Sequence, residues 1–384
     1  MKRTTMDHPT GLVALTLPMP DALAVWGLPP AERVRRELAP MRVPVMEGME
    51  LPAGAAAWLL LRGDAIFHHS VLRGMIDHPD IALTDEAGRP LAAHVSGQRS
   101  PGERQAALAW LREEGESPAG LRRVRPADVA SLYNARLRRR DDPYALRVSR
   151  ENLAAIEKRL FLATYKGVTD LVTKYWWPVP ARIATGWCVQ LGLTPNFVTT
   201  VSGVLAAAVC FLFADGLYGL GLALGWVMTF LDTVDGKLAR VTLTSSKFGD
   251  LLDHGIDLVH PLAWYYTWGM GLARGGEHFP PLMWILFGSY IAGRLCEGYF
   301  ARRFGFHLHV WRRFDSAFRL VLARRNPNMI ILTLAWAAGR PDTGLWLVAA
   351  WTAVTLAVHL VQVTQSVVAA RRGPVRSWLE LTPG

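Results

Sequence analysis

Hydrophobic and polar positions follow two different patterns along the chain, and the change falls near residue 135. In the first part, apolar runs such as GLVALTLP and AAAWLLLRGDAIFH predict strands, whereas PPAERVRRELAPM and HSVLRGMIDHP have the spacing of helices. The segment DIALTDEAGRPLAAHVS predicts a β-hairpin that turns between Asp85 and Gly88. This alternation predicts a small α/β domain with a parallel or mixed sheet.

Beyond Asn196 the pattern changes to six apolar segments, each about long enough to cross a bilayer. The predicted fold class is an α-helical membrane protein with six transmembrane helices, preceded by a small soluble α/β domain. The fifth segment is short, and FDSAFRLVLARRN precedes it as an amphipathic lead-in. The six predicted spans are 197–213, 218–239, 249–272, 282–301, 327–339 and 344–369.

The segment between these two patterns is charged at first and then rich in aromatic residues. Tyrosine and tryptophan alternate with lysine and arginine after residue 164, which predicts an amphipathic helix lying in the membrane interface. The predicted organisation is an α/β domain at 1–135, a charged linker and connecting helix at 136–164, the interfacial helix at 165–196, the six-span domain at 197–372 and a tail at 373–384.

Charge refines this picture, because the chain carries a net charge of +10 and its basic residues are unevenly spread. They concentrate in the second and fourth loops between the predicted spans and in the tail. The positive-inside rule therefore places both termini on the cytoplasmic side, and the expected location is a bacterial-type inner membrane. No nucleic-acid-binding motif accompanies the charge, and anionic lipid is the expected acidic partner. The three cysteines lack the spacing of a zinc site or a disulfide framework.

Carboxylates gather around the second of these loops, at the cytoplasmic edge of the predicted membrane. Asp232 and Asp235 fall on one stripe of a helix, and Asp253 and Asp257 fall on one face of the next. Carboxylates in membrane spans are costly unless they are paired or functional, and four together repel one another. Asp250 lies near the same face, and a supporting role for it stays open.

Oxygen-only ligands suit one or two divalent cations, Mg²⁺ or Mn²⁺ rather than Zn²⁺, and such ions keep positions open for substrate phosphates. Glycines at 236 and 249 would let a phosphate approach the helix backbone. Neutralisation by nearby arginines, or a proton relay in a transporter, is the alternative interpretation of the same aspartates.

The stretch resembles the CDP-alcohol phosphotransferase motif D-x2-D-G-x2-A-R-x8-G-x3-D-x3-D at every fixed position. The matching residues are Asp232, Asp235, Gly236, Ala239, Arg240, Gly249, Asp253 and Asp257. The element TPNFVT, from Thr194 to Thr199, is similar to a second family element that precedes the first span.

The resemblance implies a membrane transferase that moves a phosphoryl-alcohol group from a CDP-alcohol to an acceptor hydroxyl and releases CMP. It implies that two divalent ions, Mg²⁺ or Mn²⁺, are bound by Asp232, Asp235, Asp253 and Asp257. It also implies that Asp257 is the general base. The nucleotide-binding residues that it implies are Gly236, Ala239, Arg240, Gly249, Thr194, Pro195 and Asn196. It also implies a homodimer.

The acceptor and the donor are not fixed by the motif. CDP-diacylglycerol is the expected donor, with an inositol-phosphate-type synthase that uses a soluble CDP-alcohol as the alternative. Many members of the family take a phosphorylated acceptor, and the candidates to bind its phosphate are Arg294, Arg319, and Arg325 or its neighbour Arg324. Topology and lipid contact are the competing explanation for the arginines of the fourth loop.

The N-terminal part resembles the nucleotidyltransferases that are fused to some members of the family. LLLRGDAIFHHSVLRGM is similar to the G-D-x-x-F segment of that fold, with Asp64 at the usual metal position. The glycine-rich loop that would cradle nucleotide phosphates is absent after the first strand. We therefore expect a degenerate, inactive domain. An aspartate-based cation or proton transporter and a non-catalytic membrane scaffold remain as alternative functions for the whole chain.

Overall fold

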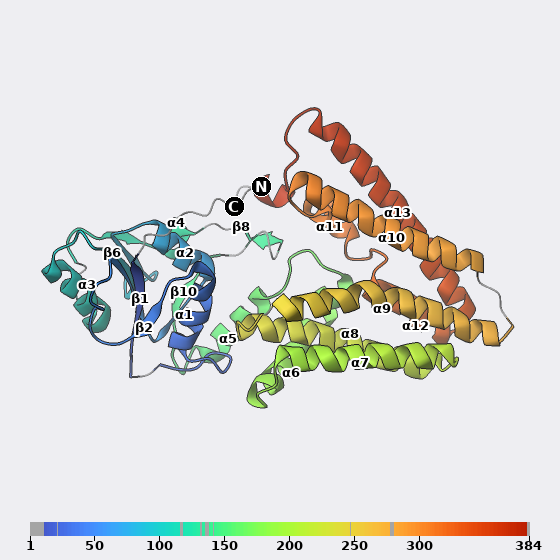
Figure 1. Cartoon of the computed structure of the whole chain (residues 1–384), viewed down its shortest axis with the longest axis horizontal. Helices are drawn as coiled ribbons and strands as arrows, with labels where there is room; N and C mark the ends of the chain where they lie inside the picture. The colour runs from blue at the N-terminus through green and yellow to red at the C-terminus, as the bar shows by residue number, and fades with distance from the viewer. Residues whose placement is uncertain are drawn as a thin grey trace. The chain divides into compact units, whose positions relative to one another are not determined.

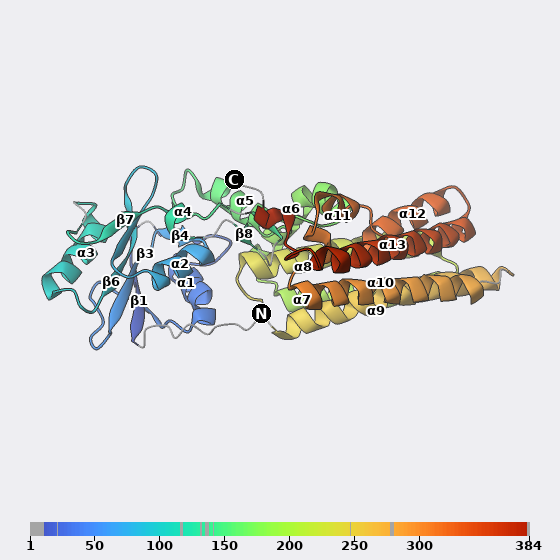
Figure 2. The same cartoon turned by 90° about the horizontal axis from the view of Figure 1, so that it is seen from above.

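The chain folds into two compact units in the computed structural model (Figures 1 and 2). The first unit comprises Met1–Asn134, Arg140–Ala163 and Val241–Thr244, and the second comprises Ala135–Arg139, Thr164–Arg240 and Ser245–Gly384. The structure describes residues 11–20, 22–115, 118–130, 133–134, 138–140, 142–245, 247–276 and 280–381.

A six-stranded mixed sheet forms the centre of the first unit, in the order β2-β1-β3-β6-β5-β7. β1 is parallel to β2 and β3, β6 is antiparallel to β3 and β5, and β5 is parallel to β7. The strands are β1 (Leu12–Leu17), β2 (Val45–Glu47), β3 (Ala57–Arg62), β5 (Ile81–Thr84), β6 (Pro90–Ser96) and β7 (Arg122–Val124). The sheet confirms the predicted small α/β domain.

Helices cover both faces of this sheet because its central strands are apolar on both sides. Leu59 and Leu61 of β3 join one buried cluster, and Trp58 and Leu60 join another, as the two-residue period of a strand requires. The first cluster packs against α1 (Pro30–Leu38) and α2 (His69–Asp77), and the second packs against α3 (Pro101–Glu113). Figure 2 shows α3 on one side of the sheet and α1 and α2 on the other.

The hairpin predicted around residue 85 is confirmed by the pairing of β5 with β6. The amide of Gly88 donates to the carbonyl of Asp85 at 3.1 Å, and Gly88 has a φ of 80°, a left-handed conformation that glycine adopts without steric cost. The remaining short elements are η1 (Ala39–Met41), β4 (Ala65–Phe67), α4 (Pro126–Val129), β8 (Tyr133–Asn134), β9 (Arg139–Arg140), β10 (Ala145–Arg147) and α5 (Leu153–Ala163).

Long helices form the second unit, and each of the six predicted apolar segments is helical. The corresponding helices are α7 (Pro195–Ala214), α8 (Tyr218–Val241), α9 (Lys247–Arg274), α10 (Pro280–Phe304), α12 (Arg325–Ala337) and α13 (Pro341–Ala370). Within this unit α7 packs against α9, and α13 packs against both α10 and α12. Shorter elements are η3 (Leu308–Val310), α11 (Arg313–Phe318) and α14 (Trp378–Leu381).

The number of membrane spans is not confirmed at six. Among the residues that the structure describes, two helices are long and apolar enough to cross a membrane, α7 and α13. α12 has 13 residues, fewer than a crossing requires. Charged side chains such as Asp232 and Asp235 lower the apolar character of α8.

The single interfacial helix predicted at 165–196 is two helical pieces. A π-helical segment, η2 (Val172–Trp176), is followed by α6 (Pro178–Gln190), which begins with a proline. Proline suits the first turn of a helix because the amide it lacks has no intrahelical partner there. The apolar side chains of Trp176, Val179 and Trp187 are exposed, as an interfacial position would require.

One titratable group in α1 makes the stability of the first unit depend on pH. Burial raises the pKa of Glu37 to about 7, against the opposing charge of Arg33. The folded state then keeps a proton that the unfolded chain has released, so stability falls as the pH rises from about 4.5 to about 7. We expect a loss of about 1–3 kcal/mol over this window. Glu37→Gln should flatten the dependence, measured as hydrogen exchange of the β1 and β3 amides. An equal pH dependence in wild type and variant would contradict this assignment.

Candidate active site

The two halves of the aspartate motif lie on consecutive helices. Asp232 and Asp235 belong to α8, and Asp257 belongs to α9. The side chains of 250–254, which include Asp250 and the predicted ligand Asp253, lie outside the described set. Among the side chains that are described, no group of three or more histidines, cysteines or acidic residues could hold a metal ion.

Arg325, the first residue of α12, joins the two helices. Its Nη2 donates to Oδ2 of Asp232 at 2.5 Å, and its Nη1 donates to Oδ1 of Asp257 at 2.9 Å. The side chains of Arg325 and Asp232 are 15% and 14% exposed, whereas that of Asp257 is 42% exposed. The guanidinium therefore provides the opposite charge that two neighbouring carboxylates need, and Asp257 keeps a face open to a reactant. Arg325 was predicted to bind the acceptor phosphate, and in this structure its guanidinium is paired with these two carboxylates.

Asp235 has a different partner. It is buried, and its Oδ2 accepts a hydrogen bond of 2.6 Å from the hydroxyl of Thr199 on α7. Thr199 is the last residue of the TPNFVT element, so this contact gives that element a physical reason to occur together with the aspartates. Thr199 was not among the predicted site residues, although it belongs to the TPNFVT element.

The beginning of the same element starts helix α7. The hydroxyl of Thr194 accepts a hydrogen bond of 3.2 Å from the amide of Phe197, and Pro195 occupies the first helical position. Asn196 is exposed. Thr194 and Pro195 thus start helix α7. Their predicted role in nucleotide binding stays a prediction.

The glycine at motif position 236 leaves room for the cationic side chain of Arg240. A Cβ atom on Gly236 would lie 3.0 Å from Nη2 of Arg240, so glycine lets that guanidinium lie along α8. Ala239 lies one turn further along the same helix. Gly249 belongs to α9.

A buried lysine next to the motif was missed by sequence reasoning. Lys237 is 3% exposed, and its Nζ lies 3.2 Å from the centroid of the Tyr165 ring and donates to the carbonyl of Thr164 at 3.3 Å. The ammonium is stabilised by the ring face and the carbonyl oxygen. The available signal was a lysine between two motif positions, Gly236 and Ala239, in a segment predicted to span the membrane.

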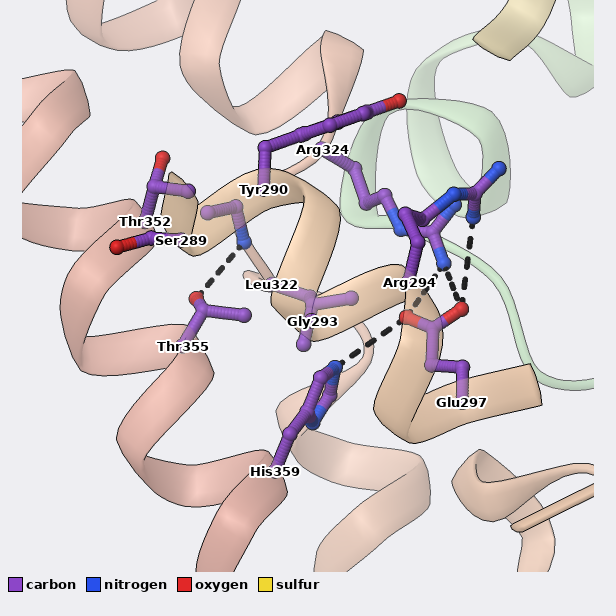
Figure 3. Close-up of a pocket in the computed structure, with 11 residues that line it drawn as sticks. Ser289, Tyr290, Gly293, Arg294, Glu297, Leu322, Arg324, Thr352, Thr355 and His359 are labelled. Atoms are coloured by element: carbon purple, nitrogen blue, oxygen red, sulfur yellow. Dashed lines mark hydrogen bonds and ion pairs between the residues drawn. The ribbon is translucent and has the colours of Figure 1, made fainter. Parts of the chain in front are cut away.

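A second polar cluster lies around Glu297 of α10 (Figure 3). Nη2 of Arg324 donates to both oxygens of Glu297, and His359 of α13 lies 3.2 Å from one of them. Arg294 makes a longer contact of 3.4 Å with the same carboxylate, so the arginine predicted within the fourth span has a carboxylate partner. Arg324 was predicted only as an alternative to Arg325 for binding the acceptor phosphate, and Glu297 and His359 were not predicted, although a glutamate within an apolar segment was a signal that such partners exist.

These residues line a small pocket. Ser289, Tyr290, Thr352 and Thr355 also line it, and Figure 3 shows Ser289, Thr352 and Thr355 on the side away from Arg294 and Glu297.

Arg319 differs from the other two predicted phosphate ligands. Arg294 and Arg325 both contact carboxylates, but Nε and Nη1 of Arg319 are buried without a hydrogen-bond partner among the described residues. A buried donor without a partner is costly, and an anion would satisfy it.

The front domain's Asp64 is held by a neighbour. Arg62, which is 3% exposed, donates from Nε and Nη2 to the two oxygens of Asp64 at 2.9 and 2.8 Å. The resemblance of this domain to a nucleotidyltransferase is not confirmed.

Comparisons with known proteins match the helical part of the chain. The family model for CDP-alcohol phosphatidyltransferase matches residues 192–359. Archaetidylinositol phosphate synthase of Pyrococcus horikoshii is 30% identical over 171 residues, which are 43% of this chain and 81% of the relative. Cholinephosphotransferase 1 of Danio rerio is 30% identical over 150 residues, which are 38% of each chain.

Among solved structures, phosphatidylinositol phosphate synthase (PgsA1) of Mycobacterium tuberculosis with CDP-DAG bound has 20% identity and a TM-score of 0.36, over 47% of this chain and 91% of that one. The same protein in complex with manganese and citrate has a TM-score of 0.38. These scores are too low to support an argument from fold. The sequence matches show that this chain belongs to the CDP-alcohol phosphatidyltransferase family and is a CDP-alcohol phosphotransferase by class.

Proposed function

We propose that the chain is an integral membrane enzyme that transfers a phosphoryl-alcohol group, in the first instance a phosphatidyl group, from a CDP-alcohol to an acceptor hydroxyl and releases CMP. The observation that carries the proposal is the meeting of Asp232 and Asp257, from the two halves of the motif, at one guanidinium. By the distribution of basic residues, the site faces the cytoplasm.

The carboxylates fit a divalent cation. The donor set is made only of oxygens, and the pair Asp232 and Asp257 already holds one cationic partner, which shows that this position favours positive charge. Asp232, Asp235, Asp253 and Asp257 would hold Mg²⁺ or Mn²⁺. Such ions, when bound, neutralise the charge of the pyrophosphate.

Residues of this chain would accept the proton of the acceptor hydroxyl and orient the carboxylates of the site. The acceptor oxygen forms a bond to the phosphorus that carries the alcohol, and the bond from that phosphorus to CMP breaks. Asp257 takes the hydroxyl proton, since its half-open carboxylate is within the site and can reach a reactant. Thr199 fixes the orientation of Asp235 by its hydrogen bond.

A phosphorylated, hydroxyl-rich acceptor is the substrate class that we favour. The partnerless guanidinium atoms of Arg319 would receive a phosphate, and the polar pocket beside Arg294 would receive hydroxyls. The name of the Pyrococcus horikoshii relative, archaetidylinositol phosphate synthase, agrees with this class.

Asp257→Asn should reduce CMP release about 100-fold or more, because an amide cannot accept the hydroxyl proton. The assay uses the purified full chain with Mg²⁺, CDP-diacylglycerol and a panel of phosphorylated and free alcohols. Asp215→Asn is the matched control, since Asp215 is an exposed aspartate whose ion-pair partner is Arg274. CMP release by Asp257→Asn at the wild-type rate would refute the assigned base.

Arg325→Gln should lower the melting temperature in the absence of divalent cations by about 5 °C, because two carboxylates lose their shared partner. Added Mg²⁺ should recover more stability in this variant than in wild type, since the unpaired carboxylates bind it. Arg274→Gln, which removes an exposed ion pair, should change little. Equal stabilisation of both variants by Mg²⁺ would argue against a cation site at these aspartates.

Arg319→Gln should raise the KM for a phosphorylated acceptor about tenfold or more and leave the KM for the CDP-alcohol unchanged, because a charged hydrogen bond to the acceptor is lost. Arg313→Gln is the control, as Arg313 is an exposed arginine of the same loop. A rise in the donor KM instead would place Arg319 at the nucleotide.

A further inference from the structure

The first unit contains four residues that are distant from it in sequence. Val241–Thr244 group with the N-terminal unit, and they join α8 directly to the residues that precede α9. Val241 is the last residue of α8 and is 2% exposed. The last residue of the helix that carries Asp232 and Asp235 is therefore buried and is grouped with the first unit.

Two arginines of α1 contact this segment through its backbone. Nη2 of Arg33 donates to the carbonyl of Val241 at 2.7 Å, and Nη1 of Arg36 donates to the carbonyl of Thr242 at 2.7 Å. Arg33 is 5% exposed and also donates to the carbonyl of Val25 at 3.3 Å, so its guanidinium is fixed within the unit.

These contacts have the chemistry of a helix cap. The last carbonyls of an α-helix have no intrahelical donor and form the negative end of its dipole, which cations stabilise. Leu243 follows with a φ of 53°, a left-handed conformation that is unfavourable for a branched side chain. Arg33 and Arg36 thus satisfy the carbonyls that this turn leaves unpaired, and they hold the chain in it.

We propose that Arg33 and Arg36 are positioning residues for the transferase reaction, because they cap the end of the helix that carries Asp232 and Asp235. Arg240 immediately precedes the capped carbonyls. Asp235 lies about 9 Å from Val241 along the helix axis. A fixed last turn of α8 holds these residues in register with the residues of α9. The role in catalysis rests on the proposed function, whereas the cap itself does not.

The neighbouring residues provide matched variants. Glu32 accepts from both Arg35 and Arg36, at 2.5 and 2.7 Å, so it orients Arg36 toward the turn. Arg35 is 53% exposed, and the structure gives it this one ion pair. Arg35→Ala therefore removes a charge and an ion pair from the same helix without touching the cap.

The experiment compares wild type, Arg36→Ala, Arg36→Lys and Arg35→Ala as full-length protein in lipid nanodiscs. Hydrogen exchange of the amides of residues 238–241, in the last turn of α8, is measured together with the Mg²⁺ concentration for half-maximal CMP release. Arg36→Ala should reduce protection of these amides about tenfold and raise the half-saturating Mg²⁺ several-fold. Arg36→Lys, which keeps a charged donor, should recover part of both effects. Unchanged exchange of the β1 and β3 amides reports that the unit stays folded.

Two results would overturn the proposal. One is wild-type exchange at residues 238–241 and wild-type Mg²⁺ dependence in Arg36→Ala. The other is an equal effect of Arg35→Ala, which would assign the change to net charge. If wild type releases no CMP from any donor, the proposed function fails, and the exchange measurement alone decides whether α1 caps α8.

Discussion

The requirement that charges remote from water be paired governs the helical unit. Asp232 and Asp257 share Arg325, and Glu297 is held by Arg324 and His359. Each of these pairs joins helices that are far apart in sequence, so the polar contacts fix the arrangement that apolar packing alone leaves open. Burying an unpaired ion costs several kcal/mol. The pairs that hold these helices together therefore also bring two motif aspartates to one guanidinium.

The α/β unit follows a different principle, since its sheet is buried on both faces by helices. Apolar side chains alternate from one face of β3 to the other, and each face has its own cluster. Polar residues in this unit contact backbone carbonyls or each other, as Arg62 and Asp64 do. Two arginines of this unit, both on α1, donate to the backbone at the end of α8 and in the turn that follows it.

Sequence periodicity predicted the elements better than it predicted their partners. The three- and four-residue spacing of the motif placed its aspartates on two helices, and the hairpin after Ile81 formed where glycine allowed the turn. The contacts of Arg325 with residues 93 and 68 positions away could not follow from local pattern, because they depend on tertiary packing. The bond from Thr199 to Asp235 is of the same kind. Proline at 178 explains why one predicted interfacial helix is two pieces.

The two polar clusters of the helical unit meet in a single dipeptide. Arg324, which bonds Glu297, is followed immediately by Arg325, which bonds the aspartates, at the point where α12 begins. Consecutive Cα atoms are about 3.8 Å apart, so the backbone of one arginine cannot shift without the other. The cluster around Glu297 and the aspartate pair are consequently tied to one point of the backbone, and a residue inserted between positions 324 and 325 would separate them without removing any side chain.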